Sequence, residues 1–348
     1  MKDLIRKTKK NLLKDSVIFL GIFSVLFFLE IVGDYQDKKY ENLDYYPLPK
    51  AKPIWERKVN LSQEIRIGAI TDTHIRPTRI NKEDDGESAQ RIIKPEYLKV
   101  FKNFNGQMNS FQPDFIVHLG DLIEGTGDPD YVGLSGINLV KKELLKNNVP
   151  IFWVVGNHDL RSVSKDQFRE VLGMDSLSYV RDWDGYRFIF LDANFNPNNR
   201  ENDFIGEGYL PGFIHPEDMN WLEERLKTNK RVFVFMHQSA MDNMDTEVDL
   251  KQSIFNAREL RNILEKYNAE AIFNGHIEVL HFMEKNGVEY YSLVGTKKNL
   301  KYPDSYYEIT IKNNQVKADI FYLDPKTKKI CRLILTENFE LNKKICNY

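Results

Sequence analysis

The 348-residue sequence predicts an α/β fold, because strands and helices alternate in its first half and strands dominate its second half. Short apolar, β-branched or aromatic runs predict strands at 65–71, 114–119, 151–155, 187–191, 231–236, 271–273, 289–294, 306–311 and 316–322. Amphipathic patterns predict helices at 136–148, 215–229 and 256–268. The run of strands after residue 286 lacks helical patterns between them, so we expect antiparallel pairing there.

Two of the expected helices carry start signals. Pro216 suits a first helical position, because its missing N–H would have no partner there, and acidic residues follow it in the first turn. Asn256 stands where an N-cap is expected, and Glu259 three residues later resembles the second member of a capping box.

The N-terminal region has the pattern of a membrane anchor. Residues 1–15 are strongly basic, and residues 16–33 are apolar with Glu30 as their single charge. A helix of that length extends about 27 Å, close to the roughly 30 Å of a bilayer core. The preceding lysines predict a single-pass membrane protein with a cytoplasmic N-terminus and an extracytoplasmic folded domain. A cleaved signal peptide is the alternative, although no small-x-small cleavage site follows the apolar run.

The remainder divides into a stalk at 34–62, a folded domain at 63–325 and a C-terminal tail at 326–348. Cys331 and Cys346 are the two cysteines of the chain. A bridge between them is permitted outside the cytoplasm, and two unpaired thiols are the equally weighted alternative. The net charge is −2 although residues 1–15 contribute +4, so the rest of the chain is acidic and a nucleic-acid partner is not expected.

Five of the expected strands end in side chains that bind metals or transfer protons. In chain order these are Asp72 and His74, then Asp121, then Asn157, His158 and Asp159, then His237, and finally His276 and Glu278. Ligand sites of α/β sheets gather at the carboxyl ends of strands, so we expect these side chains to converge. Carboxylates and imidazoles without thiolates suit Mn, Fe or Zn better than calcium, which predicts a two-metal site.

The ordered series Asp72-x-His74, Gly120-Asp121, Gly156-Asn157-His158-Asp159, His237 and Gly275-His276-x-Glu278 resembles the calcineurin-like metallophosphoesterase family over roughly residues 63–300. The resemblance implies a four-layer α/β/β/α sandwich of two mixed β-sheets that holds two divalent metal ions, Mn being favoured over Fe or Zn. It implies that the first metal is bound by Asp72 and His74, that Asp121 bridges both metals, and that the second is bound by Asn157, His237 and His276.

The same resemblance implies that His158 lies beside the substrate phosphoryl group and that Asp159 orients His158 from behind. The expected reaction is hydrolysis of a phosphomonoester, phosphodiester or pyrophosphate bond by a hydroxide that bridges the two metals.

One position departs from the family pattern, because Glu278 stands where the last histidine of Gly-His-x-His is usual. A glutamate is able to ligate Mn or Fe. The alternatives are that His281 substitutes for it or that the first metal binds poorly. The extra negative charge predicts weaker attraction for a phosphate anion and a preference for harder metals. The purple acid branch has a tyrosine where this chain has Glu124, so an Fe-tyrosinate enzyme is not expected.

The substrate is defined only by class. Segments 190–196 and 208–226 are weakly similar to Mn-dependent ADP-ribose and CDP-alcohol diphosphatases. We therefore expect a phosphorylated small-molecule, nucleotide or lipid-linked substrate. The alternative function is a membrane-anchored binding or sensing module on the same fold, with catalysis weakened by Glu278.

Overall fold

The computed structural model describes residues 64–79, 91–92, 95–125, 129–183, 185–197, 212–241, 253–296, 301–312, 315–335 and 341–346. The expected basic segment, transmembrane anchor and stalk lie outside these residues. Within the described ranges, no helix combines the length and the apolar character that crossing a bilayer requires.

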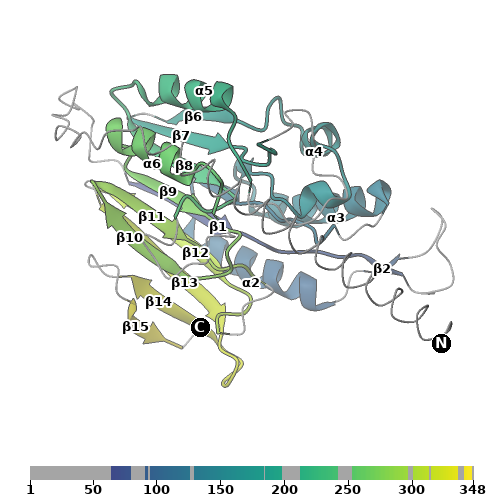
Figure 1. The fold of residues 1–348 in the computed structure, drawn as a ribbon. Coiled ribbons are helices and arrows are strands. Elements are labelled where there is room, and N and C mark those ends of the chain that lie inside the picture. Colours follow the sequence, from purple (N-terminus) through teal and green to yellow (C-terminus); the bar gives the residue numbers. More distant parts are fainter. Residues whose placement is uncertain are drawn as a thin grey trace, which may run out of the picture. The chain divides into compact units, whose positions relative to one another are not determined.

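A seven-stranded mixed sheet has the order β15-β14-β13-β12-β1-β4-β5 (Figure 1). Its strands are β1 (Ile65–Ile70), β4 (Phe115–His118), β5 (Ile151–Trp153), β12 (Tyr306–Lys312), β13 (Gln315–Leu323), β14 (Ile330–Leu335) and β15 (Leu341–Ile345). Strands β1, β4 and β5 are parallel, whereas β12 to β15 form antiparallel pairs. The expected C-terminal tail thus contributes β14 and β15 to this sheet.

A six-stranded mixed sheet has the order β10-β11-β9-β8-β7-β6. Its strands are β6 (Tyr179–Trp183), β7 (Tyr186–Leu191), β8 (Arg231–Met236), β9 (Ala271–Asn274), β10 (His281–Lys285) and β11 (Val288–Ser292). The four central strands are parallel, and the edge strands β6 and β10 are antiparallel to their neighbours. A separate ribbon pairs β2 (Thr78–Arg79) with β3 (Arg91–Ile92).

The helices are α2 (Pro95–Phe111), α3 (Asp130–Leu144), α4 (Lys165–Leu172), α5 (Pro216–Leu226) and α6 (Ala257–Lys266), with short 3₁₀ turns η1 (Leu145–Asn147) and η2 (Asp159–Arg161). Pro216 occupies the first turn of α5, as expected. Asn256 stands at the N-cap position of α6, as expected, but its side chain makes no capping hydrogen bond. Its side chain accepts from Ile214 N at 3.1 Å and donates to Ile214 O at 2.8 Å, so it ties α6 to a preceding segment instead.

Side-chain alternation along the strands produces three apolar layers. In β8, Phe233 and Phe235 pack between the two sheets, whereas Val234 and Met236 pack on the opposite face under α5 and α6. A third cluster packs α2, α3 and α4 against the outer face of the seven-stranded sheet. The order of layers is therefore helix, sheet, sheet, helix, and the α/β fold of two mixed sheets is confirmed.

Candidate active site

The structure brings every expected site residue to the edge where the carboxyl ends of β1, β4, β5, β8 and β9 meet. Several of them have positive φ angles, namely Asp72 (50°), His74 (44°), Asp121 (53°), His276 (70°) and Glu278 (53°). Residues other than glycine rarely adopt this conformation, and where they do the surrounding structure compensates a cost of order 1–3 kcal/mol each. The clustering of strained residues indicates that the edge is built for binding or catalysis.

One half of the site is arranged around the His74 ring. Its Nε2 atom lies 3.7 Å from Asp72 Oδ1, 3.7 Å from Asp121 Oδ2 and 3.6 Å from Glu278 Oε1. These separations are too long for good hydrogen bonds. They suit donor atoms that share one cation through bonds of roughly 2.0–2.2 Å.

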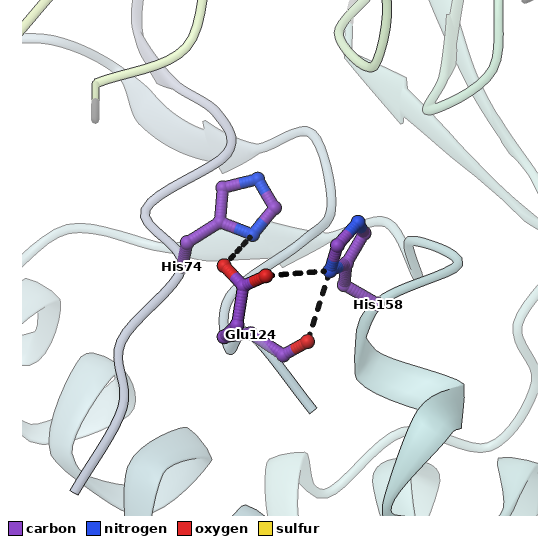
Figure 2. Close-up of side chains that lie close together, drawn as sticks. All are labelled: His74, Glu124 and His158. Carbon is purple, nitrogen blue, oxygen red and sulfur yellow. Dashed lines mark hydrogen bonds and ion pairs between the residues drawn. The ribbon is translucent and has the colours of Figure 1, made fainter. Parts of the chain in front are cut away.

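The contact of Glu124 with the other nitrogen of the His74 ring, Nδ1, explains why Nε2 is available as a metal ligand. Nδ1 lies 3.2 Å from Glu124 Oε2, at ion-pair distance, so the carboxylate favours a proton on this nitrogen (Figure 2). In the neutral ring the Nε2 lone pair then faces the carboxylates. Burial alone would lower the pKa of His74, but the carboxylates of Asp72, Glu124 and Glu278 outweigh burial and raise this pKa well above its usual value. The pocket therefore favours positive charge at Nε2.

The buried Asp72 carboxylate tests whether a cation fits here. Its Oδ2 accepts from Thr71 Oγ1 at 2.6 Å and from His276 N at 3.2 Å. Its Oδ1 is buried without a hydrogen-bond donor among the described residues. A buried acceptor without a donor is costly unless another positive group satisfies it. The donor set and this oxygen both fit a divalent metal ion.

The other half is arranged around the His237 ring. Nδ1 donates to Leu119 O at 2.7 Å, which leaves the Nε2 lone pair 3.3 Å from Asp121 Oδ1 and 3.2 Å from Asn157 Oδ1. Asp121, His237 and His276 each offer a ligand atom within 4.8 Å of the others. Three electron-pair donors face one another, an arrangement that a cation satisfies.

The two imidazoles of this half have opposite pKa shifts. Burial lowers the pKa of His237, but the Asp121 carboxylate overcomes burial and raises it to about 9. Burial and the neighbouring His237 lower the pKa of His276 to about 3. The His276 ring is therefore neutral at neutral pH, and a lone pair on it is available to a cation.

His158 lies at the rim of the site, with 12% of its side chain exposed and its Nε2 4.0 Å from Asp121 Oδ2. Its Nδ1 lies 2.9 Å from Glu124 O and 2.8 Å from Arg161 Nη1, so Nδ1 donates to Glu124 or accepts from Arg161, depending on the tautomer. Glu124 Oε1 is 3.5 Å from the same nitrogen. Figure 2 shows Glu124 between His74 and His158.

Glu124 contacts both rings, although its residue type and position predict no role in the site. Its only signal in the sequence is its position three residues after Asp121. That position cannot show whether a carboxylate turns toward solvent or into the site.

The expected role of Asp159 as the residue that orients His158 is wrong. Asp159 Oδ1 accepts from Ile123 N at 3.1 Å and Oδ2 accepts from Gly156 N at 2.9 Å. Both oxygens are engaged by backbone, so Asp159 joins the loop after β4 to the loop after β5. Burial and the nearby Asp121 charge raise the pKa of Asp159 to about 7.

Geometry also distinguishes Glu278 from His281, the alternative for the missing histidine. His281 begins β10 and pairs with Ser292. Among the described residues, no hydrogen bond, ion pair or candidate metal cluster joins His281 to the site. Glu278 is the residue beside His74, and Gly295 makes room for it, since a Cβ at Gly295 would lie 2.8 Å from Glu278 Oε2.

The model of the calcineurin-like phosphoesterase family matches residues 65–279, well over half of the chain. The chain belongs to the calcineurin-like phosphoesterase family. The resemblance inferred from the sequence is confirmed, and the protein is a metal-dependent hydrolase acting on phosphoester bonds.

Two curated relatives have related activities. The 3′,5′-cyclic adenosine monophosphate phosphodiesterase CpdA of Haemophilus influenzae is 24% identical over 247 residues, which cover 70% of this chain and 80% of the relative. The manganese-dependent ADP-ribose/CDP-alcohol diphosphatase of Arabidopsis thaliana is 23% identical over 220 residues, covering 51% and 70%.

A solved structure supports the fold. The crystal structure of a dimetal phosphatase from Danio rerio superimposes with a TM-score of 0.55 at 16% sequence identity, covering 82% of this chain and 99% of that one.

Proposed function

We propose that this protein hydrolyses a phosphodiester or pyrophosphate bond of a small, nucleotide-like molecule at a two-cation centre. The observation that carries the proposal is the convergence of two sets of electron-pair donors that share Asp121. The substrate class is supported by the relatives, one a cyclic-nucleotide phosphodiesterase and the other an ADP-ribose/CDP-alcohol diphosphatase.

The assignment of ligands follows the two halves of the site. Asp72, His74 and Glu278 would hold the first cation, whereas Asn157, His237 and His276 would hold the second. Asp121 would serve both, because Oδ2 faces His74 and Oδ1 faces His237. When bound, two such cations lower the pKa of water and neutralise charge that develops on the phosphoryl oxygens.

His158 would act on the substrate from the rim. When Arg161 donates to Nδ1, the ring proton stays on Nε2, from which it passes to the leaving oxygen. Backbone also fixes the ring, because His158 N donates to Asp121 Oδ1 at 2.7 Å. This contact holds the proton donor at a set place relative to the shared ligand.

Turnover by the full-length chain with Mn²⁺ tests the proposal. The substrates are 3′,5′-cyclic AMP, ADP-ribose, bis-p-nitrophenyl phosphate and p-nitrophenyl phosphate. We expect the diesters or the pyrophosphate to be cleaved faster than the monoester, and the Asp121→Asn variant serves as the background control. Cleavage of the monoester alone would contradict the substrate class. Binding of two metals without any turnover would favour the binding or sensing module.

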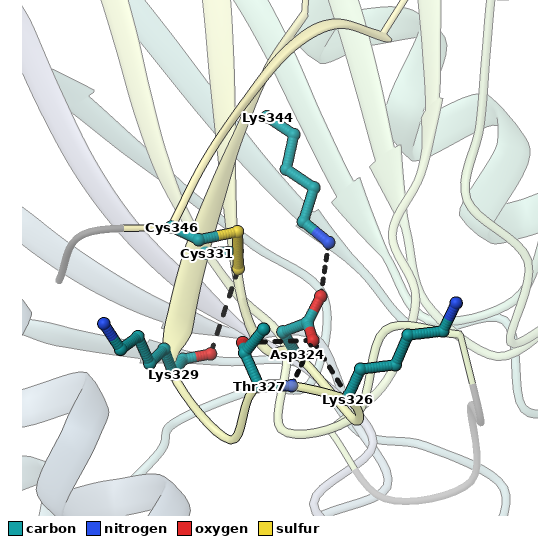
Figure 3. Close-up of a disulfide and its surroundings, with 7 residues drawn as sticks. All are labelled: Asp324, Lys326, Thr327, Lys329, Cys331, Lys344 and Cys346. Atoms are coloured by element: carbon teal, nitrogen blue, oxygen red, sulfur yellow. Dashed lines mark hydrogen bonds and ion pairs between the residues drawn. A yellow bond between two sulfur atoms is a disulfide. The ribbon is translucent and has the colours of Figure 1, made fainter.

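We further propose that residues 16–33 anchor the protein in a membrane with the catalytic domain outside the cytoplasm. The apolar segment behind a lysine cluster supports this topology. The disulfide between Cys331 and Cys346, which joins β14 to the end of β15, fits an oxidising compartment (Figure 3).

Fractionation of cells that express the full chain tests the anchor, and protease treatment of sealed cells tests the orientation through a C-terminal tag. Extraction of the protein by alkaline carbonate would contradict the anchor. A protected tag would contradict the orientation. N-terminal sequencing distinguishes an uncleaved anchor from a removed signal peptide.

A further inference from the structure

The half of the site around His74 is rich in carboxylate oxygens. Asp72, Asp121 and Glu278 each place an oxygen 3.6–3.7 Å from His74 Nε2. The ligand atoms of Asp72, His74 and Asp121 lie within 4.8 Å of one another, and Glu278 Oε1 adjoins this group at His74 Nε2. Glu124 adds a fourth carboxylate behind the ring, 3.2 Å from Nδ1. A cation here would meet three formal negative charges directly and a fourth through the imidazole.

The half around His237 is rich in nitrogen and nearly neutral. Its own side chains are His237, His276 and Asn157, and its single carboxylate is the shared Asp121. The group behind the His237 ring is the uncharged carbonyl of Leu119. A cation here would meet two nitrogens, an amide oxygen and one formal negative charge.

Glu278 is a built part of the first half rather than a surface side chain that happens to point inward. Both of its carboxylate oxygens are buried. A Cβ at Gly295 would lie 2.4 Å from Asp72 Cβ as well as 2.8 Å from Glu278 Oε2, so the loop after β11 is shaped around these two carboxylates. Glu278 lies in the loop after β9 and has a positive φ of 53°, a conformation that residues other than glycine rarely adopt.

Metal preferences follow from these donor sets. Carboxylate oxygens suit Mn²⁺ and Mg²⁺, whereas imidazole nitrogens suit Zn²⁺ and Fe²⁺. In a common site Zn²⁺ binds more tightly than Mn²⁺, so Mn²⁺ needs an oxygen-rich, strongly anionic site to compete. The two halves of this centre therefore differ in the property that separates these ions.

We propose that Glu278 makes the centre selective for two different metals, with Mn²⁺ preferred around His74 and Zn²⁺ preferred around His237. The selection rests on the proposed two-cation function. Replacement of Glu278 by histidine gives the first half two nitrogens and removes one negative charge, so the halves then differ only by the Asp72 carboxylate in place of the Asn157 amide.

Metal competition on the full-length chain tests the selection without relying on activity. The metal-free protein is equilibrated with equal concentrations of Mn²⁺ and Zn²⁺, desalted, and analysed by mass spectrometry for metal content and by electron paramagnetic resonance for Mn²⁺. We expect about one Mn and one Zn per wild-type chain. We expect the Glu278→His variant to lower the Mn-to-Zn ratio at least about tenfold, the scale on which altered ligand environments change metal affinity.

Two further variants keep the test decisive. Glu278→Gln removes the charge and retains the shape, and we expect an intermediate ratio. Glu284→His changes an exposed glutamate of β10 to histidine and should leave the ratio unchanged. Thermal unfolding of each variant establishes that it is folded.

The outcomes separate this inference from the proposed function. Two Zn in the wild-type chain, or an unchanged ratio in both folded Glu278 variants, would overturn the selection while the two-cation function stands. Fewer than one metal per wild-type chain under any mixture would contradict the two-cation function itself.

Discussion

The two halves of the active site present histidine in the same manner but support it differently. His74 Nδ1 lies 3.2 Å from the Glu124 carboxylate, whereas His237 Nδ1 donates to the Leu119 carbonyl. The Leu119 carbonyl is uncharged. Because Leu119 directly follows β4, the sheet fixes the position of this carbonyl. The carboxylate is charged and also reaches His158. The backbone at the end of β4 therefore orients His237, whereas the carboxylate that orients His74 also contacts His158, the proposed proton donor.

The electrostatic consequences of this difference are visible in the imidazoles. Burial opposes protonation of both His74 and His276, yet the pKa of His74 is raised well above its usual value and that of His276 falls to about 3. Three carboxylates around His74 account for the rise, whereas His276 has the His237 ring beside it. Local charge, and not burial, distinguishes these two imidazoles, and the Asp121 carboxylate likewise raises the pKa of His237 in the second half.

Loss of Asp121, the ligand shared by the two halves, should impair both metal sites and have the largest effect on activity. We expect Asp121→Asn to lower kcat/KM by about 10,000-fold or more, because each cation contributes several kcal/mol and about 1.4 kcal/mol corresponds to a factor of ten. Metal analysis should show depletion of both cations. Retention of one full equivalent would mean that Asp121 serves only one half.

Loss of the rim histidine should spare the metals. We expect His158→Ala to lower kcat by about 100- to 10,000-fold, the usual contribution of general acid catalysis, with metal content unchanged. Steady-state kinetics on a diester measure the effect. A leaving group of low pKa needs no proton, so its hydrolysis should be less impaired. Equal loss for good and poor leaving groups would show that His158 does not protonate the leaving oxygen.

Glu124→Gln tests the comparison directly. The amide keeps the shape but weakens the support of His74 and His158, and we expect a loss of about 10- to 100-fold in activity or in affinity of the first half for Mn²⁺. Titration calorimetry of the metal-free chain measures the affinity. Equal weakening of both metal-binding steps would show that Glu124 does not act on one half alone.

A surface carboxylate gives the smallest effect and serves as a reference. Asp182 pairs with Arg187 at 2.8 Å and with Lys230 at 3.0 Å, and these partners lower its pKa to about 2. Because the pKa is depressed in the folded state, the stabilisation is present at neutral pH and is lost as the pH falls from about 4 toward 2.

The corresponding variant, Asp182→Asn, should lower the free energy of unfolding by about 1 kcal/mol or less, since the ion pairs are partly exposed to solvent. Urea unfolding of the metal-free chain at pH 7 and pH 3 measures it. The difference between wild type and variant should shrink at the lower pH, and a difference that grows instead would contradict the ion-pair explanation.

Local sequence accounts for much of this site. The residue types after β1, β4, β5, β8 and β9 are readable in the chain, because a buried strand imposes an apolar run and each motif follows that run directly. Parallel strands bring such ends to one edge of a sheet, so convergence within each sheet was predictable without a structure. The meeting of the β1, β4 and β5 ends with the β8 and β9 ends depends on how the two sheets pack. The same local logic identified Pro216 as a helix start.

The sequence pattern did not predict hydrogen bonds between segments that are distant in the chain. Asp159 bonds to Ile123 N and Gly156 N rather than to the ring beside it, and Asn256 bonds to Ile214 rather than capping its own helix. In each case a polar side chain had several partners within reach. Its choice depends on which backbone amides the folded chain leaves without partners, and folding brings those amides near from residues far away in the sequence.

The same reason explains Glu124, which meets a ring 34 residues away, and Glu278, which lies beside His74 while His281 begins the edge strand β10. Residue types and their order along the chain specify what chemistry is present. Long-range packing selects which of those groups meet, because that selection depends on register and layer spacing that no short segment encodes.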